Sequence, residues 1–232
     1  MTFCVRVIRN PFYCWSALSC LLFIALVSTS VHADEVFNHP QSAAQLLKGP
    51  LSQPVAALRD AQLMRGNFVY RKYLKELPQP LVSRGEFVFA RGLGINWHTR
   101  EPFDSEFVLT AKGITQRDEG KTTMQVSAVE QPAVKVVARI FLALLSLDVA
   151  SLQDSFSLSG IQQDKQWRVG LQPTVAAINA VFKDAIVSGS TQVEVLNLND
   201  ANGDRTEIRF TALRYDKEIT ASDRALFVNR SQ

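Results

Sequence analysis

Two runs of β-strand patterns, separated by one strongly apolar helical pattern, constrain the fold of this chain most. Short apolar or alternating segments recur over residues 67–117 and again over 155–215. Between them, residues 132–146 begin with proline and repeat apolar residues at the spacing of a helix. Only Lys135 and Arg139 make this segment polar, so most of its surface must be covered by the rest of the protein.

These patterns predict a curved antiparallel sheet. We expect about ten strands, at 67–77, 81–90, 93–99, 107–110, 114–117, 155–162, 166–171, 185–188, 192–199 and 206–215. Shorter helices are expected at 41–47, from Pro54 to the glycine at 66, at 148–154 and at 173–182. This order favours a curved antiparallel sheet with helices on its concave face, or a β-sandwich.

An arginine interrupts an apolar strand face near the first of these runs. With the two-residue period of a strand, Phe87, Phe89 and Arg91 share one face. A cation on an apolar face is costly unless it has partners. Arg91 is therefore either a satisfied structural residue or a functional residue inside a cavity. We expect Arg91 to point into the cavity beside Phe87 and Phe89 and to bond backbone carbonyls in or near the 132–146 helix or its neighbouring loops, because a helix end has unpaired carbonyls.

The first 33 residues have the pattern of a cleaved signal peptide. Arg6 and Arg9 precede an apolar stretch over 12–27, and Val31-His32-Ala33 resembles a cleavage site. The stretch is short for a membrane span, although an uncleaved anchor is the alternative. We expect export to the periplasm, one domain over 34–215 and a polar C-terminal tail over 216–232.

The composition of the exported chain excludes several kinds of site. All three cysteines lie within the first 33 residues, so the mature chain has no disulfide and no thiolate metal ligand. Without Arg6 and Arg9, the 25 basic residues become 23 against 22 acidic ones, a net charge of +1. No basic stripe with interleaved aromatic residues is present, so nucleic acid is not an expected partner.

Enzyme signatures are equally sparse. The mature chain keeps two histidines, His39 and His98, and neither has the spacing of a metal ligand. No Gly-x-Ser-x-Gly motif is present, and the glycines at 92 and 94 join strands rather than opening a phosphate-binding helix. We expect neither a catalytic site nor a cofactor, and His98 stays the best candidate if the protein is a hydrolase.

The segment Asp200-Ala201-Asn202-Gly203-Asp204 has two interpretations. Its alternating oxygen ligands imitate the start of a calcium loop. The glycine is misplaced for that loop, and Asn-Gly between two strands is a strong hairpin signal. The hairpin is the preferred interpretation, and calcium is the alternative.

Aromatic residues suggest either a dense core or a pocket. Phe68 and Tyr70 share one strand face, as do Phe87 and Phe89. If the apolar helix fits loosely over this face, the space between them can hold a lipid. Periodicity alone does not distinguish a pocket from a core.

A family resemblance joins these features. The motif Gly66-Asn67-Phe68-x-Tyr70, the stretch Pro80-Leu81-x-Ser83-x-Gly85-x-Phe87-x-Phe89-x-Arg91-Gly92, the pair Asn96-Trp97, Pro102 and Leu109-Thr110-x-x-Gly113 resemble the LolA-type periplasmic outer-membrane lipoprotein carriers. The likeness is good over about residues 55–115, and it is nearest to the LolA-related branch found with acyl-lipid biosynthesis and export. Two positions depart from the family: Gly92 stands where the carriers usually have proline, and Ile95 replaces an aromatic residue.

The resemblance implies an incomplete antiparallel β-barrel whose concave face is closed by helices acting as a lid. It also implies a non-enzymatic, monomeric carrier that shields the acyl chains of a lipoprotein or another lipid on their way to the outer membrane. An inner-membrane donor complex and an outer-membrane acceptor are the implied partners. Arg91 matches an arginine that bonds lid carbonyls and holds the empty cavity closed. The expected cavity residues are Phe68, Tyr70, Phe87, Phe89, Ile95, Trp97, Leu109, Val137, Phe141 and Leu145. The alternatives are a non-transporting lipid-sensing or assembly module on the same fold, and an enzyme of envelope lipids.

Overall fold

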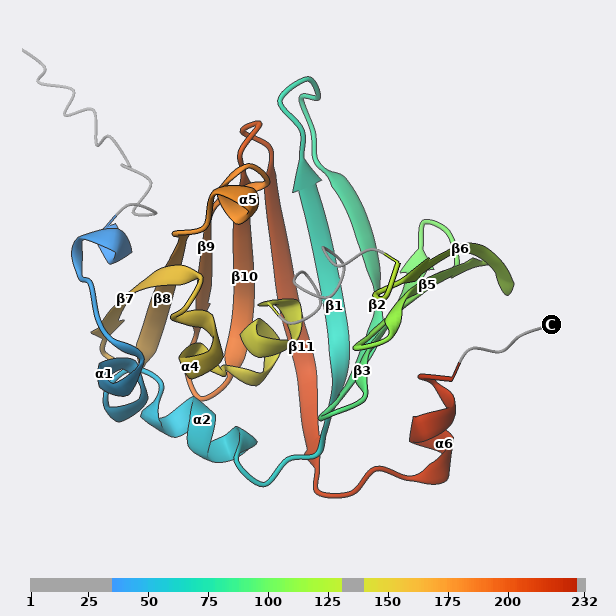
Figure 1. Cartoon of the computed structure of the whole chain (residues 1–232), viewed down its shortest axis with the longest axis horizontal. Coiled ribbons are helices and arrows are strands. Elements are labelled where there is room, and N and C mark those ends of the chain that lie inside the picture. Colours follow the sequence, from blue (N-terminus) through green and yellow to red (C-terminus); the bar gives the residue numbers. More distant parts are fainter. Residues whose placement is uncertain (1–34, 131–139, 229–232) are drawn as a thin grey trace, which may run out of the picture. The chain divides into compact units, whose positions relative to one another are not determined.

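The protein is built on one antiparallel sheet, seen in a computed structural model that describes residues 35–130 and 140–228 (Figure 1). Its strands are β1 (Leu63–Tyr73), β2 (Leu81–Ala90), β3 (Gly94–Glu101), β4 (Ser105–Thr110), β5 (Gly113–Asp118), β6 (Lys121–Ser127), β7 (Phe156–Gln163), β8 (Gln166–Pro173), β9 (Phe182–Gly189), β10 (Val193–Asp200) and β11 (Arg205–Asp216). The helices are η1 (Glu35–Asn38), α1 (Ala43–Lys48), α2 (Ser52–Leu58), α4 (Val149–Leu152), α5 (Ala176–Asn179) and α6 (Ala221–Ala225). Residues 140–146 are also helical.

The sheet consists of two meanders, which are joined by pairing of the first strand, β1, with the last strand, β11. β1 to β6 follow one another across one half of the sheet, and β7 to β11 follow one another across the other half. The halves meet where β1 pairs with β11, with Phe68 opposite Phe210. β6 and β7 are the two outer strands, so the curved sheet is not closed. The predicted incomplete barrel is confirmed.

The described part of the chain has one strand more than the sequence patterns predicted. β6 reads Lys-Thr-Thr-Met-Gln-Val-Ser, and its first five residues are exposed. Because β6 is an outer strand whose side chains are mostly exposed, its sequence has no alternating apolar residues that would predict a strand. A second difference concerns Gly66, which lies inside β1 and does not end a helix, because α2 already ends at Leu58.

The Asn-Gly hairpin is confirmed between β10 and β11. Gly203 adopts a φ of 88°, a left-handed conformation that favours glycine. The amide of Asp200 donates to the carbonyl of Asp204 at 2.9 Å, which closes the turn. The hairpin interpretation of this segment therefore replaces the calcium loop.

Helices cover the concave face of the sheet and complete the core. Figure 1 shows α4 and the 140–146 helix in front of the half formed by β7 to β11, and α1 and α2 along the lower ends of its strands. Their apolar side chains join those of the sheet in one buried cluster. The members from these four helices are Ala43, Leu46, Leu58, Ile140, Ala143, Leu144, Leu145, Val149 and Leu152, and Leu51, the N-cap of α2, joins them. The helical pattern after Pro132 is thus confirmed for residues 140–146, and its first part lies outside the described residues.

Candidate functional site

Four aromatic side chains meet on the concave face where β1, β2, β3 and β11 lie side by side. The rings of Phe68 and Trp97 stack with centroids 3.8 Å apart and an interplanar angle of 27°. Phe87 lies 5.9 Å from Trp97, and Phe210 meets Phe87 edge to face at 5.3 Å. Offset and edge-to-face pairs of this kind contribute about 0.5–1.5 kcal/mol each beyond the burial of their area. This packed aromatic cluster forms a base on the concave face beside which a pocket can form.

Two glycines make room for the cluster. Phe68 on β1 lies opposite Gly85 on β2, and Phe87 on β2 lies opposite Gly66 on β1. Because glycine has no side chain, the Phe68 ring can extend across β2 and reach Trp97 on β3. A Cβ at Gly85 would lie 1.9 Å from the carbonyl oxygen of His98. The glycines in the sequence motif therefore have a packing role.

A pocket of about 750 Å³ lies beside this cluster on the concave face. Its walls come from β1, β3, β4, β9, β10 and β11, with Phe141 of the 140–146 helix contributing from the covering layer. The apolar lining residues are Tyr70, Trp97, Phe107, Phe141, Ala180, Val181, Phe182, Leu198 and Ile208. The pocket reaches the end of the sheet where α5 and the β10–β11 turn lie, because Ala180, Val181 and Asn202 border it.

A narrow crevice of about 60 Å³ continues the pocket beneath the 140–146 helix. The two cavities share Phe141, Phe182 and Leu198 as lining residues. Apart from Asp184, the residues that line the crevice are apolar. A wide chamber that leads into an apolar slot matches a ligand with a flexible hydrocarbon part.

A charged pair forms the polar part of the pocket wall. Lys72 of β1 bonds the Asp200 carboxylate of β10, and it also donates to Thr206 Oγ1 at 3.3 Å. Partial burial acts to lower the pKa of Lys72, but the hydrogen bond and negative charge of Asp200 outweigh it and raise that pKa above 10.5. Lys72 is therefore a cation at neutral pH, and its bond to Asp200 is an ion pair.

The geometry agrees with the comparison of the chain with known protein families. A family model described as "Outer membrane lipoprotein carrier protein LolA" matches residues 59–227. The chain belongs to the LolA family. The resemblance drawn from residues 66–113 is thereby confirmed, and the matched region extends through the second meander.

Solved structures with a similar chain path include LolA relatives at low sequence identity. A LolA superfamily protein from Nitrosomonas europaea is 8% identical, with a TM-score of 0.43 over 78% of this chain and 96% of that one. A putative outer membrane lipoprotein-sorting protein domain from Vibrio parahaemolyticus is 9% identical, with a TM-score of 0.41 over 81% and 100%. A chain of the MucA/MucB complex of Pseudomonas aeruginosa is 14% identical, with a TM-score of 0.34 over 75% and 59%. Comparison with curated protein sequences returned no match.

The described members of the expected cavity set lie in three places: the pocket, a separate groove and the core. Tyr70, Trp97 and Phe141 line the pocket, and Phe89 lines a separate groove near the β2–β3 turn. Phe68, Phe87, Ile95, Leu109 and Leu145 are at most 3% exposed and lie in the core. Val137 lies outside the described residues. Most of the residues that the family resemblance suggested therefore lie in the core, and fewer of them line the pocket.

Several pocket residues were missed by sequence reasoning. Phe107 lies two residues before the core residue Leu109 on β4, and Ile208 lies two residues before the core residue Phe210 on β11. Because residues two apart in a strand share a face, the sequence could have placed Phe107 and Ile208 on the concave face. Phe182 and Leu198 had similar signals within β9 and β10. Only the tertiary structure shows that these positions border a space rather than other side chains.

Arg91 differs from its expected position. β2 ends at Ala90, so Arg91 lies in the following turn, where it is exposed and no longer shares the face of Phe87 and Phe89. Its guanidinium Nη2 donates to the carbonyl of Leu58 at 2.9 Å, at the C-terminal end of α2. The acceptor is a backbone carbonyl at a helix end, as predicted. It belongs to α2, however, and not to the 140–146 helix. Arg91 borders a groove of about 500 Å³ together with Leu142 and Ser146 of that helix.

The glycine after Arg91 explains one departure from the LolA pattern. Gly92 has a φ of 75° in the β2–β3 turn. Proline is restricted to a φ near −65°, so it cannot form this turn. The backbone after Arg91 therefore follows a different path here from that of a carrier with proline at this position.

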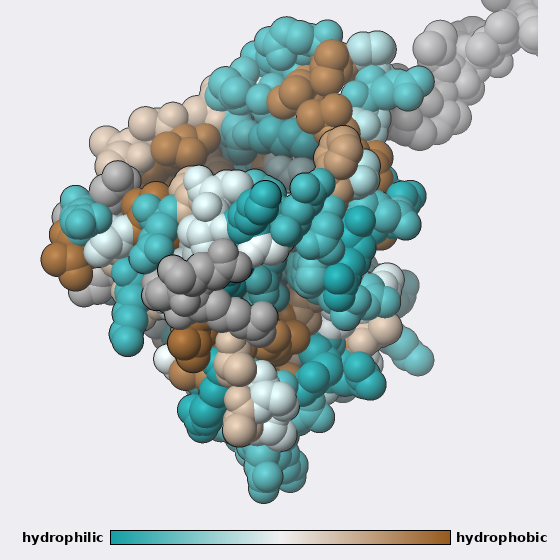
Figure 2. All heavy atoms as spheres, turned by 90° about the vertical axis from the view of Figure 1, so that its right-hand side faces the viewer, coloured by the Kyte–Doolittle hydropathy of each residue, from teal (hydrophilic) through white to brown (hydrophobic). Residues whose placement is uncertain are grey.

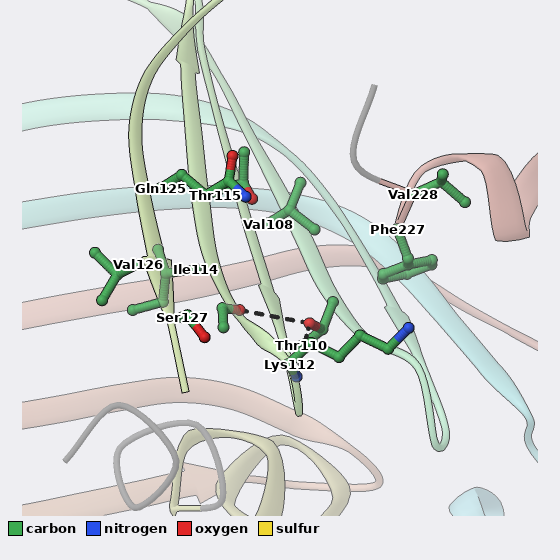
Figure 3. Close-up of a pocket in the computed structure, with 11 residues that line it drawn as sticks. Val108, Thr110, Lys112, Ile114, Thr115, Gln125, Val126, Ser127, Phe227 and Val228 are labelled. Carbon is green, nitrogen blue, oxygen red and sulfur yellow. Dashed lines mark hydrogen bonds between the residues drawn. The ribbon is translucent and has the colours of Figure 1, made fainter. Parts of the chain in front are cut away.

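A second groove, on the outer face of β4 to β6, has a different character (Figure 3). It measures about 400 Å³, and its lining is mixed, with Lys112, Thr115 and Ser127 beside apolar residues. Figure 3 shows Ile114 and Val126 on one side of this groove and Phe227 and Val228 on the other. Figure 2 shows this side of the protein as largely hydrophilic, with apolar residues in separate groups among the described atoms. The concave pocket is therefore the better site for an apolar ligand.

The C-terminal segment docks on the outer face through a charged network. Asn96 and Arg117 each bond the carboxylate of Glu106, at 2.6 and 2.7 Å, and they also donate to the carbonyls of Leu226 and Val228. Residues 216–228, expected as a polar tail, thus include α6 and a turn after it whose carbonyls accept these bonds. Among the described residues, no group of three metal-binding side chains is present, and no helix has the length and apolarity of a membrane span.

The Glu106 network predicts a loss of stability in acid. Burial acts to raise the pKa of Glu106, but the bonds from Asn96 and Arg117 outweigh it and hold that pKa below 4.5. A depressed pKa stabilises the folded state above pH 4.5, and this contribution is lost as the pH falls through the folded value. The unfolding midpoint of wild type should exceed that of Glu106→Gln at neutral pH, and the gap should close in acid. Glu76→Gln, in an exposed turn, should show no such gap, and a gap that is independent of pH would refute the assignment.

Proposed function

We propose that this LolA-family protein is a periplasmic carrier that shields the acyl chains of a lipoprotein or another lipid in its concave pocket. The observation that carries the proposal is the pocket itself, a mostly apolar chamber that borders a mostly apolar crevice. Its volume of about 750 Å³ lies within the range of roughly 300–1,000 Å³ found for small-molecule sites.

The energetics explain why such a chamber suits a carrier. Each methylene group removed from water is worth about 0.8 kcal/mol, so a segment of ten methylenes gains about 8 kcal/mol. A lipid rarely leaves a membrane into water without an equivalent apolar surface to receive it. A pocket that opens at one end of a sheet can provide this surface and still release the ligand.

Export and partners complete the proposal. The signal-peptide pattern over residues 1–33 supports delivery to the periplasm. Family membership supports a lipoprotein cargo, an inner-membrane donor complex and an outer-membrane acceptor. The protein acts in this scheme as a monomer, without a cofactor and without a nucleic-acid partner.

The two tryptophans of the mature chain allow a direct test. Trp97 lines the pocket, whereas Trp167 is 2% exposed, donates to the carbonyl of Ser190 and lies away from the pocket. An acyl chain that carries bromine near its end should quench Trp97 fluorescence in the mature protein, with saturation. Trp97→Phe should lose the quenching while Trp167 stays emissive. If brominated lipids never quench the wild-type protein, and its mass in native spectrometry is always that of the empty protein, the carrier proposal fails.

Transfer separates a carrier from the alternative of a lipid-sensing or assembly module. A carrier should increase the rate at which a fluorescent acylated peptide moves between donor and acceptor vesicles, in proportion to its concentration. A module that binds lipid without accelerating this transfer would support the alternative.

We further propose that Arg91 holds α2 against the β2–β3 turn and so restrains the layer over the concave face. Its charged bond to the Leu58 carbonyl is only partly buried and Arg91 itself is exposed, so the contribution of this bond should be within the usual range of about 0.5–1.5 kcal/mol. Arg91→Leu should fold and should exchange bound lipid about two- to tenfold faster. Arg84→Leu, which removes an exposed arginine of β2, is the matched control. Equal exchange rates for Arg91→Leu and wild type would remove the latch role.

A further inference from the structure

The charged pair in the pocket wall is unusual because it lies among apolar lining residues. Lys72 follows Tyr70 on the same face of β1, two residues further along the strand. Asp200 is the last residue of β10. Both side chains are only about one-fifth exposed, at 21% and 20%. A ligand whose apolar part occupies the pocket would place its polar end close to this pair.

Within residues 35–130 and 140–228, Lys72 makes two hydrogen bonds through its ammonium group. A lysine ammonium has three N–H donors. One bonds Asp200 and another bonds Thr206 Oγ1. The third donor can bond an acceptor oxygen of a ligand without breaking the ion pair.

The charges around the pair balance. Asp204 lies close enough to act on Lys72 electrostatically. Lys75 of the β1–β2 turn lies with its side chain over Gly203, and its backbone amide donates to Asp204 Oδ1 at 3.2 Å. The charged residues that line the pocket are one lysine, Lys72, and one aspartate, Asp200, so the lining offers no excess positive charge for an anion. A ligand carboxylate entering beside Lys72 would also meet the carboxylate of Asp200 in a partly desolvated site, where like charges repel strongly.

We propose that Lys72 and Asp200 form a specificity subsite that accepts acyl ligands with an uncharged, acceptor-rich polar end, such as an ester, and rejects free fatty acids. Lys72 donates to the ligand oxygen, and Asp200 both holds Lys72 in place and repels a carboxylate. This inference rests on the proposed function, because it requires that the pocket bind acyl chains.

The test compares a brominated fatty acid with its glycerol monoester, using Trp97 quenching in the mature protein. Wild type should bind the ester at least about tenfold more tightly than the acid of the same chain length. Asp200→Asn should improve binding of the acid and reduce this preference by about tenfold, because the substitution keeps the shape and removes the repelling charge. Lys72→Met should weaken binding of both ligands, and of the acid more, because Asp200 is then left without its partner.

A matched control separates this effect from a general change of charge. Asp216→Asn removes a carboxylate that pairs with Arg65 at the opposite end of β11, and it should leave the preference unchanged. The subsite is overturned if wild type binds both ligands equally, or if the two asparagine variants have the same preference. If neither ligand quenches Trp97, the proposed function fails together with the subsite, whereas equal binding of both ligands refutes the subsite alone.

Discussion

Replacing Phe141 by glutamate is expected to lower the affinity for a brominated acyl ligand by about 100-fold, because it places a charge in the apolar wall. Phe141 lines both the wide pocket and the narrow crevice, so a ligand cannot pass from one to the other without contacting it. The residue is only partly buried, and the carboxylate can therefore reach water in the empty protein. The loss should appear in ligand binding rather than in folding.

The neighbouring residue provides the control for this variant. Leu142 has a similar partial exposure on the same helix, but it lines the groove near Arg91 and not the pocket. Leu142→Glu should change helix stability to a similar degree and leave quenching of Trp97 close to that of wild type. Equal affinities for the two variants would mean that the acyl chain does not occupy the space beside Phe141.

Replacing Phe68 by alanine is expected to lower the free energy of unfolding by about 3–5 kcal/mol, the usual cost of removing a buried phenylalanine. Phe68 is 1% exposed, and its ring stacks on Trp97. Its loss leaves a cavity at the junction of the two meanders, where Phe68 lies opposite Phe210. Because this junction joins distant parts of the chain, little can move in to fill the space.

Urea denaturation, followed by circular dichroism, measures this change. The emission of Trp97 should also change in the folded variant, since the indole loses its stacking partner. Leu81→Ala, at the exposed start of β2, should alter stability by less than about 0.5 kcal/mol. A Phe68→Ala protein as stable as wild type would show that the aromatic cluster is loosely packed.

Much of the fold was predictable from local patterns. β2 was expected at 81–90 and is found there, and the hairpin at Asn202-Gly203 follows from the dipeptide. β6 was missed because an outer strand with exposed residues carries no apolar alternation. α6 was missed for a similar reason, since its contacts are a capping box at Thr220 and an ion pair from Arg65 to Asp223.

The site was predictable only in part. The motif identified the aromatic cluster and the strand face, but Phe68 and Phe87 proved to be buried beneath the pocket. Arg91 was placed by continuing the alternation of Phe87 and Phe89 one step too far, because the turn begins directly after Ala90. A strand period predicts the direction of a side chain only while the strand continues.

The sequence by itself determined the strand faces, the apolar helix and the family, because periodicity and motif spacing are local properties of the chain. Only the tertiary structure decided which aromatic side chains are core and which border a pocket. It also decided that Lys72 and Asp200, 128 residues apart in the chain, share one pocket wall. The physical reason is that a cavity is a space left between distant segments, and its position depends on how the two meanders and the covering helix pack together.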